Sequence, residues 1–160
     1  MQGTFNADEV FQMAIEIEKR GAAFYRAASD FFDEPGVKAL LKSLSEMELE
    51  HEKEFASLQE SMTRDSSYAQ GYDPDGVAAS YLGSLTSGKV FDPSLIFAGT
   101  ETVEGVLKKG IEAEKNSIVL YTGLKGVVPD ELGRDKVDRI IREEMKHLAV
   151  LVEQLGSLEG

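Results

Sequence analysis

The chain of 160 residues is strongly acidic, with 29 acidic against 17 basic residues and a formal charge of −12, and it contains no cysteine. Nucleic acid and anionic membranes are therefore unsuitable partners, because phosphate contacts need clustered lysine and arginine. The lack of cysteine excludes disulfides, zinc–thiolate sites, iron–sulfur clusters and cysteine nucleophiles. The longest apolar run, Leu148 to Val152, is too short for a transmembrane helix or a signal-peptide core, so we expect a cytoplasmic protein.

Two long helices are predicted in the first part of the chain, because apolar residues recur there at spacings of three and four. The first runs from about Ala7 to Phe32. Asn6 is placed to cap it, and Glu9 stands in the capping-box position. The second runs from about Val37 to Met62. The sequence Asp-Glu-Pro-Gly at 33–36 separates the two helices, and so short a connection predicts an antiparallel pair.

The second part of the chain repeats this arrangement after a long connection. Residues 63–100 are rich in Ser, Gly, Asp and Pro, and a short helix is expected at 77–85. Two further long helices are predicted, from about Glu101 to Gly126 and from about Pro129 to Leu155. We therefore expect a single all-α domain, residues 1–160. Its architecture is a four-helix bundle made of two antiparallel hairpins joined by a long crossover.

The two hairpins form an internal repeat with an offset of 96 residues, as from 48 to 144. Ile-Glu-Ile-Glu-Lys at 15–19 corresponds to Ile-Glu-Ala-Glu-Lys at 111–115. Glu48-x-x-His51 corresponds to Glu144-x-x-His147, so the two histidines of the protein occupy equivalent positions. A lone Glu-x-x-His on a helix is usually structural, but chance would rarely place both histidines in this way.

The helical period sorts the glutamates into two groups. One glutamate in each long helix lies on the apolar stripe, and in two helices a histidine follows one turn later. The inward-facing set is Glu18, Glu48, His51, Glu114, Glu144 and His147. Neighbouring glutamates are expected on solvated faces: Glu16, Glu46, Glu50, Glu54, Glu112 and Glu143.

The four inward carboxylates are predicted to lie at a similar depth, because each stands roughly 20–24 Å along its helix from the nearest turn. Burying even one unpaired charge costs several kcal/mol, so four converging carboxylates require cations. Four glutamates and two histidines suit a pair of divalent metals, iron or manganese by ligand type, and zinc also accepts such ligands. Tyr25 and Tyr121 are either ordinary core aromatics or hydrogen-bond donors behind these ligands.

These residues lie in stretches that resemble the rubrerythrin branch of the ferritin-like superfamily: AIEIEKRGAAFY, EMELEHEKEF, IEAEKNSIVLYTGLK and EEMKH. The resemblance covers all four long helices and implies a ferritin-like bundle that binds two iron ions. It implies that Glu48 and Glu144 bridge the metals. It also implies reduction of hydrogen peroxide or oxygen by a site that cycles between diferrous and diferric states. The ligands it implies are Glu18, Glu48, His51, Glu114, Glu144 and His147.

The sequence departs from this family in two ways. Full-length rubrerythrins carry a rubredoxin-like domain with a four-cysteine iron site, which a cysteine-free chain ending at Gly160 cannot form. Electrons are therefore expected from an external donor such as a rubredoxin. Typical members also have an extra glutamate one turn after the third-helix ligand, where this chain has Ser117, and the repeat-related residue is Gly21. We therefore expect a symmetric site with six ligands.

The resemblance thus implies a non-haem di-iron oxidoreductase of oxidative-stress defence, with no catalytic residues beyond the metal ligands. The alternative is an iron-binding protein of the ferroxidase type without a dedicated reductant. A third hypothesis is a structural module that keeps the site for stability. We expect a homodimer rather than a large cage, because no further C-terminal helix for cage assembly is evident.

Overall fold

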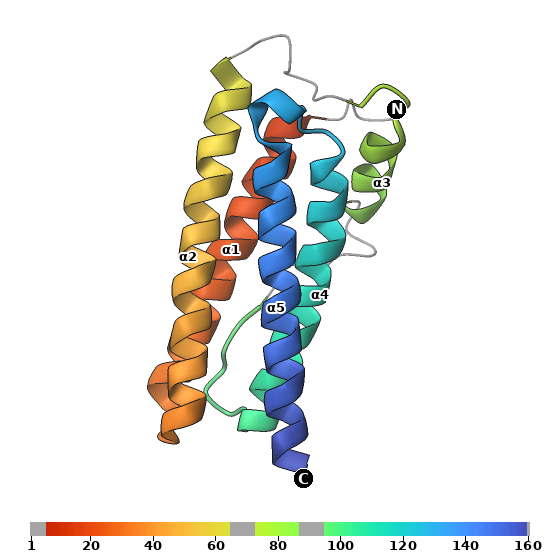
Figure 1. Cartoon of the computed structure of the whole chain (residues 1–160). Coiled ribbons are helices and arrows are strands. Elements are labelled where there is room, and N and C mark those ends of the chain that lie inside the picture. The colour runs from red at the N-terminus through yellow and green to blue at the C-terminus, as the bar shows by residue number, and fades with distance from the viewer. Residues whose placement is uncertain (1–5, 65–72, 87–94, 160) are drawn as a thin grey trace.

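Four long helices form the body of the protein (Figure 1). The computed structural model describes residues 6–64, 73–86 and 95–159. The predicted helical bundle of two hairpins is confirmed, and so is the short helix within the connection. None of the helices in these ranges is long and apolar enough to cross a membrane. The elements are α1 (Ala7–Phe31), α2 (Pro35–Arg64), α3 (Val77–Leu85), α4 (Val103–Lys125), the 3₁₀ turn η2 (Asp130–Leu132) and α5 (Arg134–Glu159).

Each hairpin packs as an antiparallel pair, α1 against α2 and α4 against α5. α2 ends at one end of the bundle and α4 begins at the other, so the connection returns the chain along the length of the bundle (Figure 1). α3 lies within this connection and packs on α4. There, the hydroxyl of Tyr81 donates a hydrogen bond to the carbonyl oxygen of Val119 at 2.7 Å. The crossover is therefore anchored to the second hairpin.

Side-chain caps stabilise the N-terminal ends of α1 and α2. The side-chain oxygen of Asn6 accepts a backbone N–H bond at 2.9 Å, so this residue caps α1 as predicted. α2 begins at Pro35, two residues before the predicted start, because proline fits the first position of a helix. The Glu34 carboxylate accepts from the amides of Gly36 and Val37 at 2.9 and 2.7 Å, and these bonds hold its pKa below the ordinary value.

The second turn differs from the prediction of one helix starting near Pro129. Residues 130–132 form a single 3₁₀ turn, and α5 begins only at Arg134. Gly133 causes the break, because its φ of 120° lies in a region that glycine adopts far more readily than other residues. A Cβ atom at this glycine would also lie 2.7 Å from Leu58 Cδ2. The second turn is therefore packed closely against α2.

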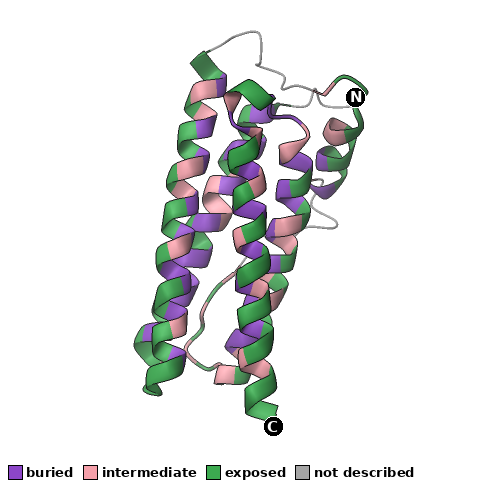
Figure 2. Cartoon of the chain, in the orientation of Figure 1, coloured by how far each residue is buried: buried purple, intermediate pink, exposed green. Residues whose placement is uncertain are grey.

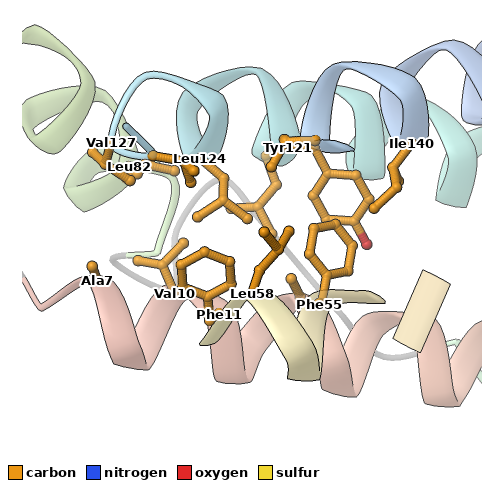
Figure 3. Packing of buried hydrophobic residues seen from close by; sticks show 14 of the residues in the cluster. Ala7, Val10, Phe11, Phe55, Leu58, Leu82, Tyr121, Leu124, Val127 and Ile140 are labelled. Carbon is orange, nitrogen blue, oxygen red and sulfur yellow. The ribbon is translucent and has the colours of Figure 1, made fainter. Parts of the chain in front are cut away.

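The core consists of two apolar clusters with a polar layer between them. The buried faces of the long helices point toward the bundle axis (Figure 2). One cluster lies toward the second turn, where the rings of Phe55 and Tyr121 have centroids 4.7 Å apart (Figure 3). The other cluster lies toward the first turn and includes Phe24 and Leu41. On every long helix the buried charged residues fall between the residues of the two clusters, so the fold places them at one level.

Gly123 of α4 lies against α3, and we expect this contact to exclude a larger residue. A Cβ atom there would lie 2.5 Å from Tyr81 Cδ1 and 2.8 Å from Leu82 Cδ2. Gly123→Ala should lower the free energy of unfolding by about 1–2 kcal/mol, because the cost of overpacking exceeds the gain in helix propensity. Chemical denaturation measures this change.

Gly156→Ala in α5 is the matched control, because no atom lies within 4 Å of its added Cβ. It should raise the free energy of unfolding by up to about 1 kcal/mol. Equal effects of the two substitutions would contradict the close packing of α3 on α4.

Candidate metal centre

Six buried side chains from the four long helices meet in the polar layer. All of them are at most 7% exposed. Each glutamate points inward because it shares a helical face with residues of the apolar clusters. The structure thus brings together all six residues that the sequence analysis selects as candidate metal ligands. They are Glu18 from α1, Glu48 and His51 from α2, Glu114 from α4, and Glu144 and His147 from α5.

The six side chains divide into two overlapping sets of four. Within each set, one nitrogen or oxygen atom per residue lies within 4.8 Å of the corresponding atoms of the others. Glu48 and Glu144 belong to both sets, so their two carboxylates lie between the two candidate metal positions. The first set is Glu18, Glu48, His51 and Glu144, and the second is Glu48, Glu114, Glu144 and His147.

Distances within the sets suit shared coordination. Two ligand atoms that bind one ion at about 2.1 Å lie roughly 3.0–3.4 Å apart at the usual coordination angles. His51 Nδ1 lies 2.9 Å from Glu144 Oε1 and 3.7 Å from Glu18 Oε2. His147 Nδ1 lies 3.4 Å from Glu48 Oε1. Both histidines therefore present Nδ1 to the carboxylates at separations near those of ligands around one ion.

Four polar atoms of the cluster lack a hydrogen-bond partner among the residues that the structure describes. They are Oε2 of Glu18, Oε1 of Glu48, Oε2 of Glu144 and Nδ1 of His147. Each such buried atom costs about 1–3 kcal/mol when it stays unsatisfied. A bound cation would satisfy these atoms, because all of them face other members of the cluster. The donor set therefore fits a pair of divalent ions.

Two buried tyrosines connect the two hairpins through the ligands. The hydroxyl of Tyr25 donates to Glu114 Oε1 at 2.8 Å, and the hydroxyl of Tyr121 donates to Glu18 Oε1 at 2.6 Å. Burial and the neighbouring carboxylates raise the pKa of both phenols well above the ordinary value, so they remain neutral donors. Of the two alternatives for these residues, the structure supports hydrogen bonding to the ligands. Each hairpin thus orients a carboxylate of the other.

Glu143 contradicts the prediction of a solvated face. Its side chain is only 27% exposed, and its Oε2 lies 2.6 Å from His51 Nε2. His51 therefore faces the cluster through Nδ1 and Glu143 through Nε2. The position borders the inward face because it directly precedes Glu144, and the imidazole reaches it across the bundle. The sequence signal was weak, since the repeat-related residue is Met47, which has no carboxylate.

The other outward glutamates mostly agree with the prediction. Glu46, Glu50 and Glu112 are exposed as predicted, whereas Glu16 is half-buried, which corrects its expected place on the solvated face. Glu54 is also half-buried, which corrects its expected place on the solvated surface. Its Oε1 accepts a hydrogen bond from Arg139 of α5 at 2.7 Å. This ion pair links α2 to α5 beside the polar layer.

Protonation partly relieves the repulsion among the buried carboxylates when no cation is bound. Burial, and then the charge of Glu144, raise the pKa of Glu18 to about 7. Burial, and then the charge of Glu48, raise the pKa of Glu144 to about 8. The pKa of Glu48 is also raised by burial and by the charge of Glu18. Glu114 differs: burial opposes its ionisation, but bonds from Glu144, His147 and Tyr25 lower its pKa overall.

The pKa values of the two histidines are also raised, although for them burial acts in the opposite direction. Burial alone would lower the pKa of His51, but hydrogen bonds with Glu144 and Glu18 raise it to about 11. The pKa of His147 is raised in the same way, by hydrogen bonds with Glu114 and Glu144 that outweigh the effect of burial. Without a metal the cluster therefore holds protons on both histidines and on some of its carboxylates. Metal binding must displace them.

The fold matches a solved structure over nearly its whole length. A crystal structure from Thermotoga maritima, described as a ferritin-like diiron-carboxylate protein, superposes with a TM-score of 0.70 over 97% of this chain and 97% of that chain. The two sequences are 23% identical, so the likeness establishes the fold alone. No protein-family model and no curated protein sequence matches the chain. The protein has the ferritin-like fold, and its place in the rubrerythrin branch stays a prediction.

Loss of the Glu143 carboxylate should weaken one metal position. Glu143→Ala removes the acceptor of the His51 Nε2 proton and should lower the affinity for one of two ions by about 10–100-fold, the usual effect of such partners. Glu143→Gln should have a smaller effect, because its amide oxygen still accepts the hydrogen bond. Titration against a competing chelator measures both affinities. The control is Glu153→Ala, an exposed change in the same helix, and an equal effect there would contradict the role of Glu143.

The metal-free protein should lose stability as pH rises from about 4.5 to about 8. Across this window the folded state holds more protons than the unfolded chain, because the folded pKa values of Glu18 and Glu144 are raised to about 7 and 8. The free energy of unfolding then falls with pH. Bound divalent metal should reverse the trend by favouring the ionised ligands. Denaturant unfolding of metal-free and metal-loaded protein over this range tests the prediction.

Glu144→Gln should flatten the profile of the metal-free protein and weaken metal binding. The matched change Glu153→Gln, on the exposed face of α5, should do neither. Superimposable profiles for the metal-free and loaded protein would show that the buried carboxylates do not titrate in this way.

Proposed function

We propose that this chain is a di-iron protein that reduces hydrogen peroxide or oxygen with electrons from an external donor. The observation that carries the proposal is the pair of ligand sets that share Glu48 and Glu144. Each set offers three carboxylates and one imidazole, and hard donors of this kind suit iron or manganese. The ferritin-like fold, shared with a protein described as a diiron-carboxylate protein, agrees with this proposal.

A pair of ferrous ions would supply the two electrons that a peroxide needs for cleavage of its O–O bond. The chain contributes the ligands, their orientation and the exclusion of water. Tyr25 and Tyr121 would orient one carboxylate each: Tyr25 donates to Glu114 Oε1 and Tyr121 donates to Glu18 Oε1. In Glu18 this leaves Oε2, which faces His51 Nδ1 within the ligand set. The apolar clusters on either side of the layer limit the access of solvent. No nucleophile or general base from the protein is required.

An external electron donor is part of the proposal because the chain has no cysteine. It therefore has no thiolate iron site of its own that could return electrons to the metals. A small redox protein such as a rubredoxin would fill this role.

A second candidate, iron oxidation and storage chemistry of the ferroxidase type, is favoured by Ser117. This residue occupies the position one turn after Glu114, and its hydroxyl donates to the carbonyl oxygen of Ala113 at 3.0 Å. It offers no further carboxylate to the metals. The resulting set of six ligands needs no redox-linked exchange of ligands, which agrees with a simple ferrous-oxidation site.

Rapid mixing of ferrous-loaded protein with hydrogen peroxide and with oxygen tests the proposal. We expect two irons per chain, faster oxidation by peroxide than by oxygen, and repeated turnover when a reduced rubredoxin is supplied. Glu144→Gln should abolish the paired site, whereas Glu153→Gln should leave it intact.

Faster oxidation by oxygen, with no turnover on addition of the donor, would favour the ferroxidase alternative. A stoichiometry below two irons per chain in anomalous scattering, with no metal pair near Glu48 and Glu144, would contradict both. The structural hypothesis would be favoured if the protein kept its full stability after metal removal and showed no reactivity with either oxidant.

A further inference from the structure

A cavity of about 500 Å³ lies on the side of the bundle formed by α1 and α4. Its inner wall includes Glu48 and Glu114, and Tyr25 lies beside them. Leu95 and Ile96 of the connection form part of its outer wall. The cavity therefore joins the surface of the protein to one edge of the candidate metal centre.

The cavity meets the site at an edge between α1 and α4. Glu48 and Glu114 are 4% and 2% exposed, whereas Glu18 and Glu144 are fully enclosed. Of the six candidate ligands, Glu48 and Glu114 alone line this cavity. A molecule that enters here would therefore reach the metals past these two carboxylates.

The size of the cavity exceeds what hydrogen peroxide or oxygen needs. A water molecule takes up about 30 Å³ of the liquid, and hydrogen peroxide is only slightly larger. Cavities of about 300–1,000 Å³ are typical of sites for organic ligands. Small residues make the space: Gly21 of α1 and Ala113 and Ser117 of α4 all lie along the wall. The repeat-related positions 21 and 117 thus leave room where larger side chains would fill it.

The chemistry of the lining favours a neutral, largely apolar molecule. Ile17, Leu95 and Ile96 supply aliphatic surface. The charged groups at the rim are neutralised by ion pairs outside the cavity or at its edge: Lys108 with Glu104 at 2.8 Å, Lys109 with Glu101 at 2.9 Å, and Glu112 with Lys115 at 2.9 Å. Neither an anion nor a cation would find an unpaired partner among these groups.

From this geometry we propose that the cavity binds the apolar part of a neutral organic hydroperoxide, with its O–O group at Glu48 and Glu114. The inference rests on the proposed function and specifies its substrate class. An organic hydroperoxide matches the two ends of the cavity, because it joins a reducible polar group to an apolar body. Reduction breaks the O–O bond, takes two electrons from two ferrous ions and two protons from solvent, and yields an alcohol and water. The external donor then returns the two electrons.

The test compares cumene hydroperoxide with hydrogen peroxide on the ferrous-loaded full chain. The rate of oxidation by cumene hydroperoxide should saturate with its concentration, as expected for a bound substrate. Ala113→Phe projects a ring into the cavity and should lower the rate with cumene hydroperoxide, relative to that with hydrogen peroxide, by about tenfold or more. Asn116→Phe, from the same wall, should act in the same direction and serves as a second variant.

A binding measurement gives a readout that does not depend on turnover. Calorimetry should detect binding of the alcohol product, 2-phenyl-2-propanol, to the wild-type protein and a loss of that binding in Ala113→Phe. Ala149→Phe is the matched control, because Ala149 is exposed on α5 and does not line the cavity. It should change neither the ratio of rates nor the binding of the alcohol.

The outcomes separate this inference from the proposed function. Oxidation by neither peroxide would overturn both together. Oxidation by hydrogen peroxide, combined with no alcohol binding and an unchanged ratio of rates in both phenylalanine variants, would overturn the organic substrate alone.

Discussion

The burial of four carboxylates at one level of the bundle is the constraint on which the rest of the structure depends. Water that would normally solvate them is excluded by apolar clusters on both sides. The compensation comes from within the layer, through two histidines, two tyrosine hydroxyls and protons held by the carboxylates themselves. These partners still leave several oxygens and one nitrogen unsatisfied. Apolar residues in place of this polar layer would make the bundle at least as stable. The presence of the layer is therefore best explained by bound metal.

Much of this arrangement could be predicted because it depends on two strong periodicities. The spacing of three and four separated Glu18 from Glu16 and identified the inward residue of each helix. The offset of 96 residues then paired Glu48 with Glu144 and gave all six clustered side chains. The helix boundaries were less accurate, because they depend on local conformation. α2 begins at Pro35, earlier than the apolar periodicity suggests. α5 begins later than predicted, at Arg134, because Gly133 has a positive φ.

Contacts between helices were the features that periodicity could not predict. Glu143 has the helical position of a solvated residue, yet an imidazole from α2 reaches it. Glu54 is drawn inward by Arg139 of another helix. The cavity beside Glu48 and Glu114 depends on where residues 95 and 96 of the connection cross α1 and α4. Each of these features depends on how two elements are placed relative to each other. The periodicity of a single helix carries no information about that placement.

The crossed tyrosine bonds have a consequence for the origin of the fold. A single hairpin paired with a second copy of itself by a two-fold axis would already supply four glutamates, two histidines and both tyrosine contacts. Such a symmetric pair would have to place the same residue beside each histidine. Joining the hairpins in one chain removes that restriction, and here Glu143 stands on one side while Met47 occupies the matching position on the other. Two halves in one chain can therefore differ around two similar ligand sets, because a change beside one histidine need not be repeated beside the other.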